Sequence, residues 1–117
     1  MMTDQSWIFS YGTLRQPEVQ RALFGRALEA VDDALCGFRI GMVRISNPQV
    51  VALSGSGEHP GLIATGEPSD RVSGTALGVT SAELKAADAY EAADYRRVAV
   101  TLESGRAAFV YVARPQP

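Results

Sequence analysis

The glutamate at position 91 is the side chain in this sequence with the clearest potential for chemistry. A Thr-Ser-Ala-Glu capping box that begins at Thr80 predicts a helix over residues 81–91. Leu84, Ala87 and Glu91 follow helical spacing, so Glu91 extends the apolar stripe of that helix. A carboxylate on the core side, at the negative end of the helix dipole, should have a raised pKa. Such a group suits a general base that takes and returns a proton near neutral pH.

The same glutamate also has a plainer interpretation. Arg96 and Arg97 follow it closely in the sequence and offer a simple ion pair. Glutamates are mostly exposed or paired in folded proteins. The residues alone therefore leave a catalytic and a structural Glu91 both open.

A break in an early predicted strand supplies the second candidate. The strand over residues 8–11 ends at Tyr11-Gly12-Thr13-Leu14. A chain that turns at a strand end presents consecutive N–H groups, which can bind an anion. Gly12, without a side chain, would let a ligand carboxylate or a developing oxyanion approach the main chain. The alternative is a plain turn into the helix that Pro17 begins.

Other reactive side chains give weaker signals. His59 is the single histidine and falls in a Gly/Ser-rich stretch, where we expect a solvated residue. Cys36 is the single cysteine and falls within a predicted strand, so a Cys–His pair is disfavoured. One histidine and one cysteine do not provide zinc-ligand spacing, and no metal site is predicted. Ser54 and Ser56 lack the strand–Ser–helix elbow of hydrolases.

The remaining pattern predicts short strands with few helices. We expect helices over 17–24 and 81–91, and a Gly/Ser/Pro-rich loop over 54–70 with a short extended piece at 62–64. Further strands are predicted over 35–45, 50–53, 72–79, 95–102 and 107–112. In the strand over 35–45, Gly37 and Gly41 should mark bulges or bends.

This order of elements predicts one α+β domain over residues 1–117. We expect a small closed or partly closed mixed, mostly antiparallel β-barrel of about five to seven strands, with two or so helices packed outside. The strands and helices do not alternate regularly, and neither a GxGxxG motif nor a P-loop is present. A dinucleotide-binding fold is therefore disfavoured.

Composition narrows the class of partner. The net charge of −2 gives no basic surface for nucleic acid or anionic membranes. No apolar run approaches the roughly 20 residues that a membrane span needs, and the first residues do not resemble a signal peptide. A single cysteine excludes an internal disulfide. We expect a cytoplasmic protein that binds neither nucleic acid nor membrane.

Three segments together resemble the gamma-glutamyl cyclotransferase-like proteins, which include gamma-glutamylamine cyclotransferases and small bacterial members. They are "FSYGTL" near the N-terminus, Val72-Ser73-Gly74 in a middle strand, and "ADAYEAADYRRVAVTL" near the C-terminus. The match covers nearly the whole chain in order and spacing. The resemblance implies a small mixed β-barrel with helices outside.

The resemblance also implies residue roles. The segment Tyr11-Gly12-Thr13-Leu14 would hold the α-carboxylate and α-amino region of a γ-glutamyl substrate. Glu91 would be the catalytic acid and base, Tyr95 and Arg97 would contact substrate, and Asp88 would be structural.

The implied enzyme releases 5-oxoproline and an amine or amino acid, needs no cofactor or metal, and is a monomer or homodimer. The alternatives are a non-catalytic or differently specialised small-molecule binding module on the same fold, and a protein-interaction domain without a pocket.

Overall fold

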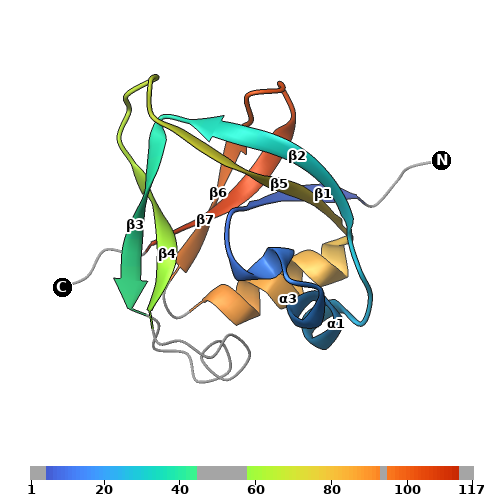
Figure 1. The fold of residues 1–117 in the computed structure, drawn as a ribbon. Coiled ribbons are helices and arrows are strands. Elements are labelled where there is room, and N and C mark those ends of the chain that lie inside the picture. Colours follow the sequence, from blue (N-terminus) through green and yellow to red (C-terminus); the bar gives the residue numbers. More distant parts are fainter. Residues whose placement is uncertain (1–4, 45–57, 93–94, 114–117) are drawn as a thin grey trace.

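The computed structural model describes residues 5–44, 58–92 and 95–113. Within these ranges the chain forms seven strands and two α-helices, with a short 3-10 turn, η1, between the first strand and the first helix (Figure 1). In chain order the elements are β1 (Ser6–Ser10), η1 (Thr13–Arg15), α1 (Pro17–Phe24), β2 (Glu29–Cys36), β3 (Phe38–Arg44), β4 (Glu58–Ala64), β5 (Arg71–Val79), α3 (Ser81–Glu91), β6 (Tyr95–Thr101) and β7 (Ala107–Ala113).

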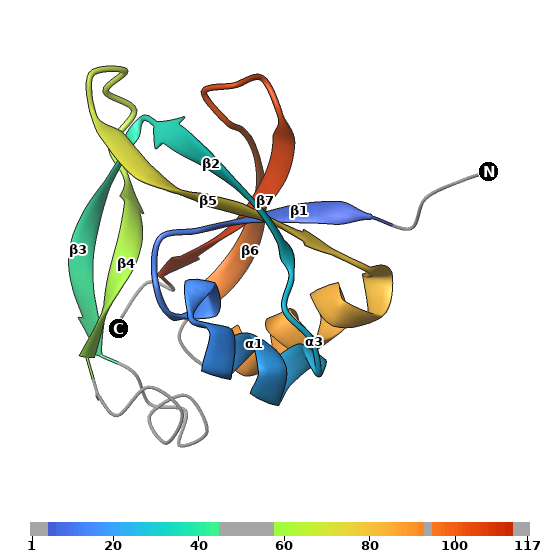
Figure 2. The same ribbon diagram turned by 45° about the vertical axis from the view of Figure 1, so that its right-hand side comes forward.

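All seven strands belong to one mixed, curled sheet. The order along the sheet is β2-β5-β1-β7-β4-β3, and β6 pairs with β7 outside this path. The pairings β1–β7 and β4–β7 are parallel, and the other pairings are antiparallel. Both views place α1 and α3 together on one side of the sheet, away from the β3–β4 ribbon (Figures 1 and 2). The predicted α+β fold is confirmed as a partly closed sheet with helices outside.

Strand β7 organises this sheet because it has three neighbours. It pairs with β6 along its whole length, from Tyr95 opposite Ala113 to Thr101 opposite Ala107. It also meets β1, with Ile8 opposite Phe109, and β4, with Leu62 opposite Val112. Since a strand has two edges, β1 and β4 must share the second edge of β7. The sheet therefore splits at β7 and curls.

Alternation along the strands produces two apolar clusters, one on each face. The first lies between the sheet and the helices, and the second lies within the curl of the sheet. In β1, Ile8 belongs to the first cluster and Phe9 to the second. In β7, Tyr111 belongs to the first, while its neighbours Val110 and Val112 belong to the second. Tyr111 therefore faces the helices.

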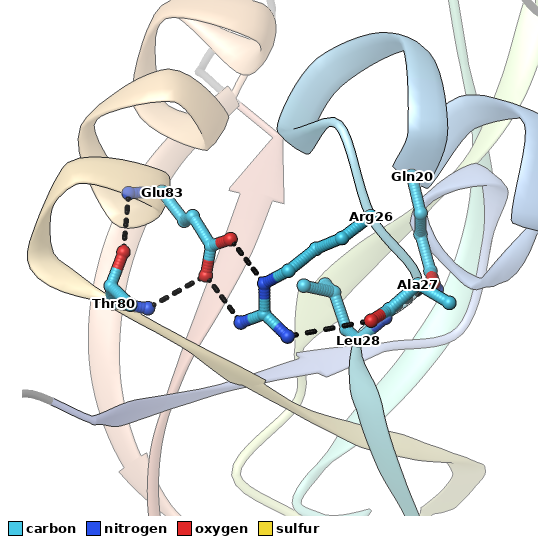
Figure 3. A network of polar contacts seen from close by, with 6 residues as sticks. All are labelled: Gln20, Arg26, Ala27, Leu28, Thr80 and Glu83. Atoms are coloured by element: carbon cyan, nitrogen blue, oxygen red, sulfur yellow. Dashed lines mark hydrogen bonds and ion pairs between the residues drawn. The ribbon is translucent and has the colours of Figure 1, made fainter.

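A buried amide ties the first helix to both of its neighbours. The Gln20 side chain donates to the carbonyl oxygen of Leu14 at 2.8 Å. It also accepts from the N–H of Leu28 at 3.0 Å (Figure 3). Because Gln20 is only 6% exposed, both ends of its amide need partners inside the protein. The contact fixes the turn after β1 against the start of β2.

The start of α3 is fixed by a second polar group. Thr80 Oγ1 accepts from the N–H of Glu83 at 3.1 Å, and Glu83 Oε1 accepts from the N–H of Thr80 at 2.9 Å. This is the predicted capping box. The same Glu83 carboxylate accepts two 2.7 Å hydrogen bonds from the Arg26 guanidinium, which follows α1 (Figure 3). The Arg26 pairing therefore joins the two helices, and α3 ends at Glu91 as predicted.

The strand expected over 35–45 is confirmed over residues 38–44, but it is not one strand, because the chain changes partners at the bend expected at Gly37. Gly37, at φ 84°, separates β2 from β3. Strand β2 pairs with β5, whereas β3 pairs with β4. The left-handed backbone conformation at this junction favours glycine. Gly41 is not a bulge, since the register from Phe38 to Arg44 continues without interruption.

Two strands extend beyond the predicted ones. No strand was expected over residues 29–34, where acidic residues disfavour one. The Asp33 carboxylate, however, accepts hydrogen bonds from the N–H groups of Ala34 and Ser104 and from the Ser104 hydroxyl. The extended piece expected at 62–64 is the end of the longer strand β4. The strand expected over 50–53 lies outside the described residues.

The other predicted elements agree with the structure. Helix α1 matches the expected 17–24, and β5, β6 and β7 match the expected strands to within two residues at each end. Within the ranges that the structure describes, neither helix has the length and apolar character to cross a membrane.

Replacing Gly74 with alanine should destabilise the fold. A Cβ at this position would lie 2.5 Å from the Ser10 carbonyl oxygen and 2.7 Å from Phe9 Cζ. Because Phe9 is buried, neither neighbour can move freely. We expect Gly74→Ala to lower the free energy of unfolding by about 1–3 kcal/mol, as overpacking does, measured by urea denaturation. Ser73→Ala, at the exposed neighbouring position, should change it by about 0.5 kcal/mol or less. Equal stability of the two variants would contradict the expected clash.

Candidate functional site

Glu91 is the last residue of α3 and is half-buried. The apolar stripe that precedes it is real: Ala87 belongs to the cluster between sheet and helices, and Leu84 packs against that cluster. Since residues three and four apart share a helix face, Glu91 continues this face toward the end of the helix. The predicted helical position of the glutamate is therefore confirmed.

The backbone of the Tyr11–Leu14 segment is held on one side by Arg15. The Arg15 guanidinium donates to the Tyr11 carbonyl at 2.7 Å and to the Gly12 carbonyl at 3.4 Å. The Arg15 N–H also donates to the Gly12 carbonyl, at 3.2 Å. Since Gln20 holds the Leu14 carbonyl, side chains bind three of the four carbonyl groups in this segment. The turn is thus rigid rather than a loose connection.

The Tyr11 side chain connects this turn to β4 and to Glu91. Its hydroxyl oxygen accepts a hydrogen bond from the N–H of Leu62 at 3.1 Å. Burial raises the pKa of the Tyr11 phenol strongly, the charge of Glu91 raises it further, and the Leu62 N–H opposes both. The charge of Glu91 therefore acts on the Tyr11 phenol, although the two residues are far apart in the sequence.

The charge of the same carboxylate also acts on two further tyrosines. Burial is the main cause that raises the pKa of Tyr90, a hydrogen bond with the Thr13 side chain opposes it, and the Glu91 charge adds to it. Burial and a hydrogen bond to Asp88 raise the pKa of Tyr111, and Glu91 contributes there as well. Tyr90 and Tyr111 are 1% and 6% exposed. The charge of Glu91 thus contributes to the raised pKa of two buried tyrosines, Tyr90 and Tyr111, and of the partly buried Tyr11.

Tyr95 and Arg97, both expected to contact substrate, lie on β6 in different surroundings. Tyr95 is buried in the cluster between sheet and helices. The Arg97 guanidinium lies 4.6 Å from the centre of the Phe109 ring and 3.5 Å from Asp88 Oδ2. Arg97 therefore contacts the aspartate one helical turn before Glu91, and its predicted role at a substrate stays a prediction.

A separate hollow of about 610 Å³ opens beside β2 and β5, and of the Tyr11–Arg15 region only Arg15 reaches it. Its charged groups largely satisfy one another: Arg71 donates to both carboxylate oxygens of Glu103, and Asp33 accepts from Ser104. The hollow does not include Glu91. Its lining consists of Arg15, Asp32, Asp33, Ala34, Arg71, Ser73, Gly74, Thr75, Glu103 and Ser104.

The weaker sequence candidates fall elsewhere. Residue 59 lies in strand β4, so the expectation that His59 belongs to a loop is wrong. Cys36 is exposed at the end of β2, with its sulfur 3.6 Å from a carboxylate oxygen of Glu103. Ser54 and Ser56 lie outside the described residues.

Sequence reasoning missed Tyr111. Its hydroxyl donates to Asp88 Oδ1 at 2.7 Å, one helical turn before Glu91. The predicted hairpin of strands 95–102 and 107–112 is present, and in it Arg97 lies opposite Tyr111. No local signal, however, shows that this pair packs against α3.

Residues 8–117 match the family model described as gamma-glutamyl cyclotransferase, AIG2-like. The chain belongs to this family. The resemblance of its three sequence segments to gamma-glutamyl cyclotransferase-like proteins is thereby confirmed. No curated protein is similar enough to this family member to count as a match.

Solved structures show the same fold. A solution structure from Arabidopsis thaliana is 26% identical, with a TM-score of 0.70 over 97% of this chain and 71% of that one. A gamma-glutamyl cyclotransferase is 15% identical, with a TM-score of 0.73 over 94% and 67%. A yeast gamma-glutamyl cyclotransferase specific to glutathione is 12% identical, with a TM-score of 0.65 over 95% and 69%. The cyclotransferase fold is therefore shared by this chain and these proteins.

The buried tyrosines predict how stability depends on pH. Tyr11, Tyr90 and Tyr111 have raised pKa values in the folded state, so the fold favours their protonated forms. This contribution is fully present below the unfolded-state pKa of about 10 and is lost as the pH rises toward the folded-state values. We expect the free energy of unfolding, measured with urea, to fall as the pH rises above about 10.

A matched variant distinguishes the effect of these phenols on the pH dependence of stability from the effect of other titrating groups. In Tyr111→Phe the decline with pH should be shallower than in the wild type. Tyrosinate absorbance that develops fully in the folded protein near pH 10, the ordinary value of a phenol, would contradict burial of these hydroxyls.

Proposed function

We propose that this protein is a gamma-glutamyl cyclotransferase-type enzyme. It would convert a γ-glutamyl compound into 5-oxoproline and an amine or amino acid, with Glu91 as general acid and base. The observation that carries the proposal is that the half-buried Glu91 ends the face of α3 whose Leu84 and Ala87 pack in one cluster with Leu14 of the turn after β1. Membership of the cyclotransferase family supports the same chemistry.

The reaction begins with a proton transfer. The α-ammonium group of the substrate gives one proton to the Glu91 carboxylate and becomes a nucleophilic amine. The amine nitrogen attacks the γ-carbonyl carbon of the same molecule and closes a five-membered ring. Because both groups belong to one molecule, most of the acceleration comes from holding the folded-back conformation. A half-buried carboxylate such as Glu91 suits this proton transfer.

The second half of the reaction returns the proton. Glu91 gives its proton to the leaving nitrogen as the carbon–nitrogen bond breaks. The extra proton on the attacking nitrogen follows to the departing amine, so the lactam and the protonated amine together hold the protons of the substrate. One carboxylate therefore serves both steps, and the balance requires neither an oxidant nor another reactant.

The turn after β1 would hold the negative charge of the substrate. The first N–H groups of a helical turn lack acceptors within that turn, and η1 begins at Thr13. Arg15 binds the Tyr11 and Gly12 carbonyls, which directs these carbonyls toward the guanidinium. The Gly12 N–H donates to the Ser10 hydroxyl oxygen at 3.4 Å. The N–H groups of Thr13 and Leu14 would then face the α-carboxylate or the developing oxyanion.

Glu91→Gln should abolish the reaction and preserve the fold. The amide keeps the shape of the side chain but cannot accept the proton. We expect 5-oxoproline release from γ-glutamyl amines and dipeptides to fall by roughly 10²–10⁴-fold, the usual contribution of a general base. Chromatography of the products measures this release.

Glu18→Gln on the exposed side of α1 is the matched control and should keep full activity. Unchanged turnover in Glu91→Gln would refute the role of Glu91. Binding of γ-glutamyl compounds without turnover in the wild type would favour the non-catalytic binding module.

Gly12→Ala should impair substrate binding more than stability. Within the described part of the chain, no atom lies within 4 Å of a Cβ placed at Gly12. The backbone φ of −135° is one that other residues adopt. The added methyl group would enter the space through which a ligand approaches the main chain.

We expect KM for the γ-glutamyl substrate to rise about tenfold or more, since misplacement by a methyl group costs positioning. The free energy of unfolding should change by about 1 kcal/mol or less. A variant with unchanged KM would show that ligands do not approach Gly12.

A further inference from the structure

A second carboxylate, Asp88, lies on the same face of α3 as Glu91. The two residues are three apart, which places their side chains side by side on the helix surface. Asp88 Oδ1 accepts a 2.7 Å hydrogen bond from the Tyr111 hydroxyl. The Tyr111 oxygen therefore lies on the helix face that carries Glu91. The Tyr111 side chain also packs in one apolar cluster with Leu14 of the Tyr11–Leu14 segment and with Tyr90.

The hydrogen bond to Asp88 determines which further hydrogen bonds the Tyr111 hydroxyl can make. A phenol has one proton to donate, and its oxygen can also accept. With the proton directed to Asp88, only the acceptor side of the Tyr111 oxygen remains for another partner. Arg97 lies 3.5 Å from the second carboxylate oxygen of Asp88, so Asp88 is held from two sides. The acceptor direction of Tyr111 is thus fixed.

We propose that Tyr111 is a substrate-binding residue whose oxygen accepts a hydrogen bond from the α-amino nitrogen, and that Asp88 is the positioning residue that orients it. This inference rests on the proposed function. An ammonium group has three N–H donors. Glu91 takes the proton of one, and Tyr111 would hold a second.

The arrangement has a consequence for the attacking nitrogen. Once Glu91 has removed a proton, the amine can rotate and turn its lone pair away from the γ-carbonyl. A fixed acceptor on one N–H restricts that rotation and keeps the lone pair on the side of the carbonyl. Burial and Asp88 raise the pKa of Tyr111, so the phenol keeps the proton that it donates to Asp88. Tyr111 therefore acts as an acceptor throughout the reaction and is not itself a base.

The test compares two ligands that differ only in the α-amino group. One is a γ-glutamyl amine and the other is the corresponding glutaryl amine, in which hydrogen replaces the ammonium group. Binding is measured by calorimetry in the Glu91→Gln variant, which would neither turn the ligand over nor attract its charge. We expect the γ-glutamyl ligand to bind more tightly than the glutaryl ligand.

Adding Tyr111→Phe should remove most of this preference. Hydrogen bonds to charged groups contribute roughly tenfold to a hundredfold in binding, so the ratio of the two dissociation constants should fall by about that factor. The affinity for the glutaryl ligand should stay unchanged and serves as the internal control for a damaged fold. Equal weakening of both ligands, or a preference that survives Tyr111→Phe, would overturn the inference.

Substitutions at Asp88 separate orientation from packing. Asp88→Asn keeps an oxygen that can accept from Tyr111 and should retain much of the ammonium preference, whereas Asp88→Ala should lose it. Identical losses in the two variants would count against a positioning role for Asp88. Wild-type protein that releases no 5-oxoproline would defeat the proposed function itself, and normal turnover without ammonium preference would defeat this inference alone.

Discussion

The sharing of one edge of β7 by two parallel partners is the constraint on which the rest of the architecture depends. Strand β6 occupies the first edge, and β1 and β4 divide the second. From this shared edge the β3–β4 ribbon departs from the β1–β5–β2 side (Figure 2). The space enclosed by this division holds the inner apolar cluster. The helices cover the outer face, where a second cluster forms.

The same division determines which side chains meet at the end of α3. Tyr11 follows β1 and reaches the backbone of β4 at Leu62, which is possible because both strands adjoin β7. Tyr111, on the opposite face of β7 from Val110 and Val112, reaches Asp88. Glu91 influences both phenols. One tyrosine in the turn after β1 and one on β7 are thus influenced by a single carboxylate at the end of one helix.

Local signals in the sequence predicted some of this and not the rest. The capping box at Thr80 and the helical spacing up to Glu91 depend on neighbours in sequence, and both agree with the structure. Strand β2 was missed because the burial of Asp33 depends on Ser104, far along the chain. Tyr111 was missed for the same reason, since what singles it out is its hydrogen bond to Asp88, which lies far from it in the sequence. Contacts between distant segments leave no periodic pattern.

The pairing of the first described strand with the last one affects how the protein is made. Ile8 of β1 lies opposite Phe109 of β7, so during synthesis β1 must wait for almost the entire described chain to emerge before that edge is covered. Closing such a long segment is slow because its entropic cost precedes the contacts that reward it. Tyr11 directly follows β1 and Tyr111 lies on β7, so the two tyrosines are near opposite ends of the segment that must close. A ribosome-bound fragment that ends before β7 would therefore contain every residue of the α3 capping box, but neither the strand that covers this edge of β1 nor the tyrosine that faces Asp88.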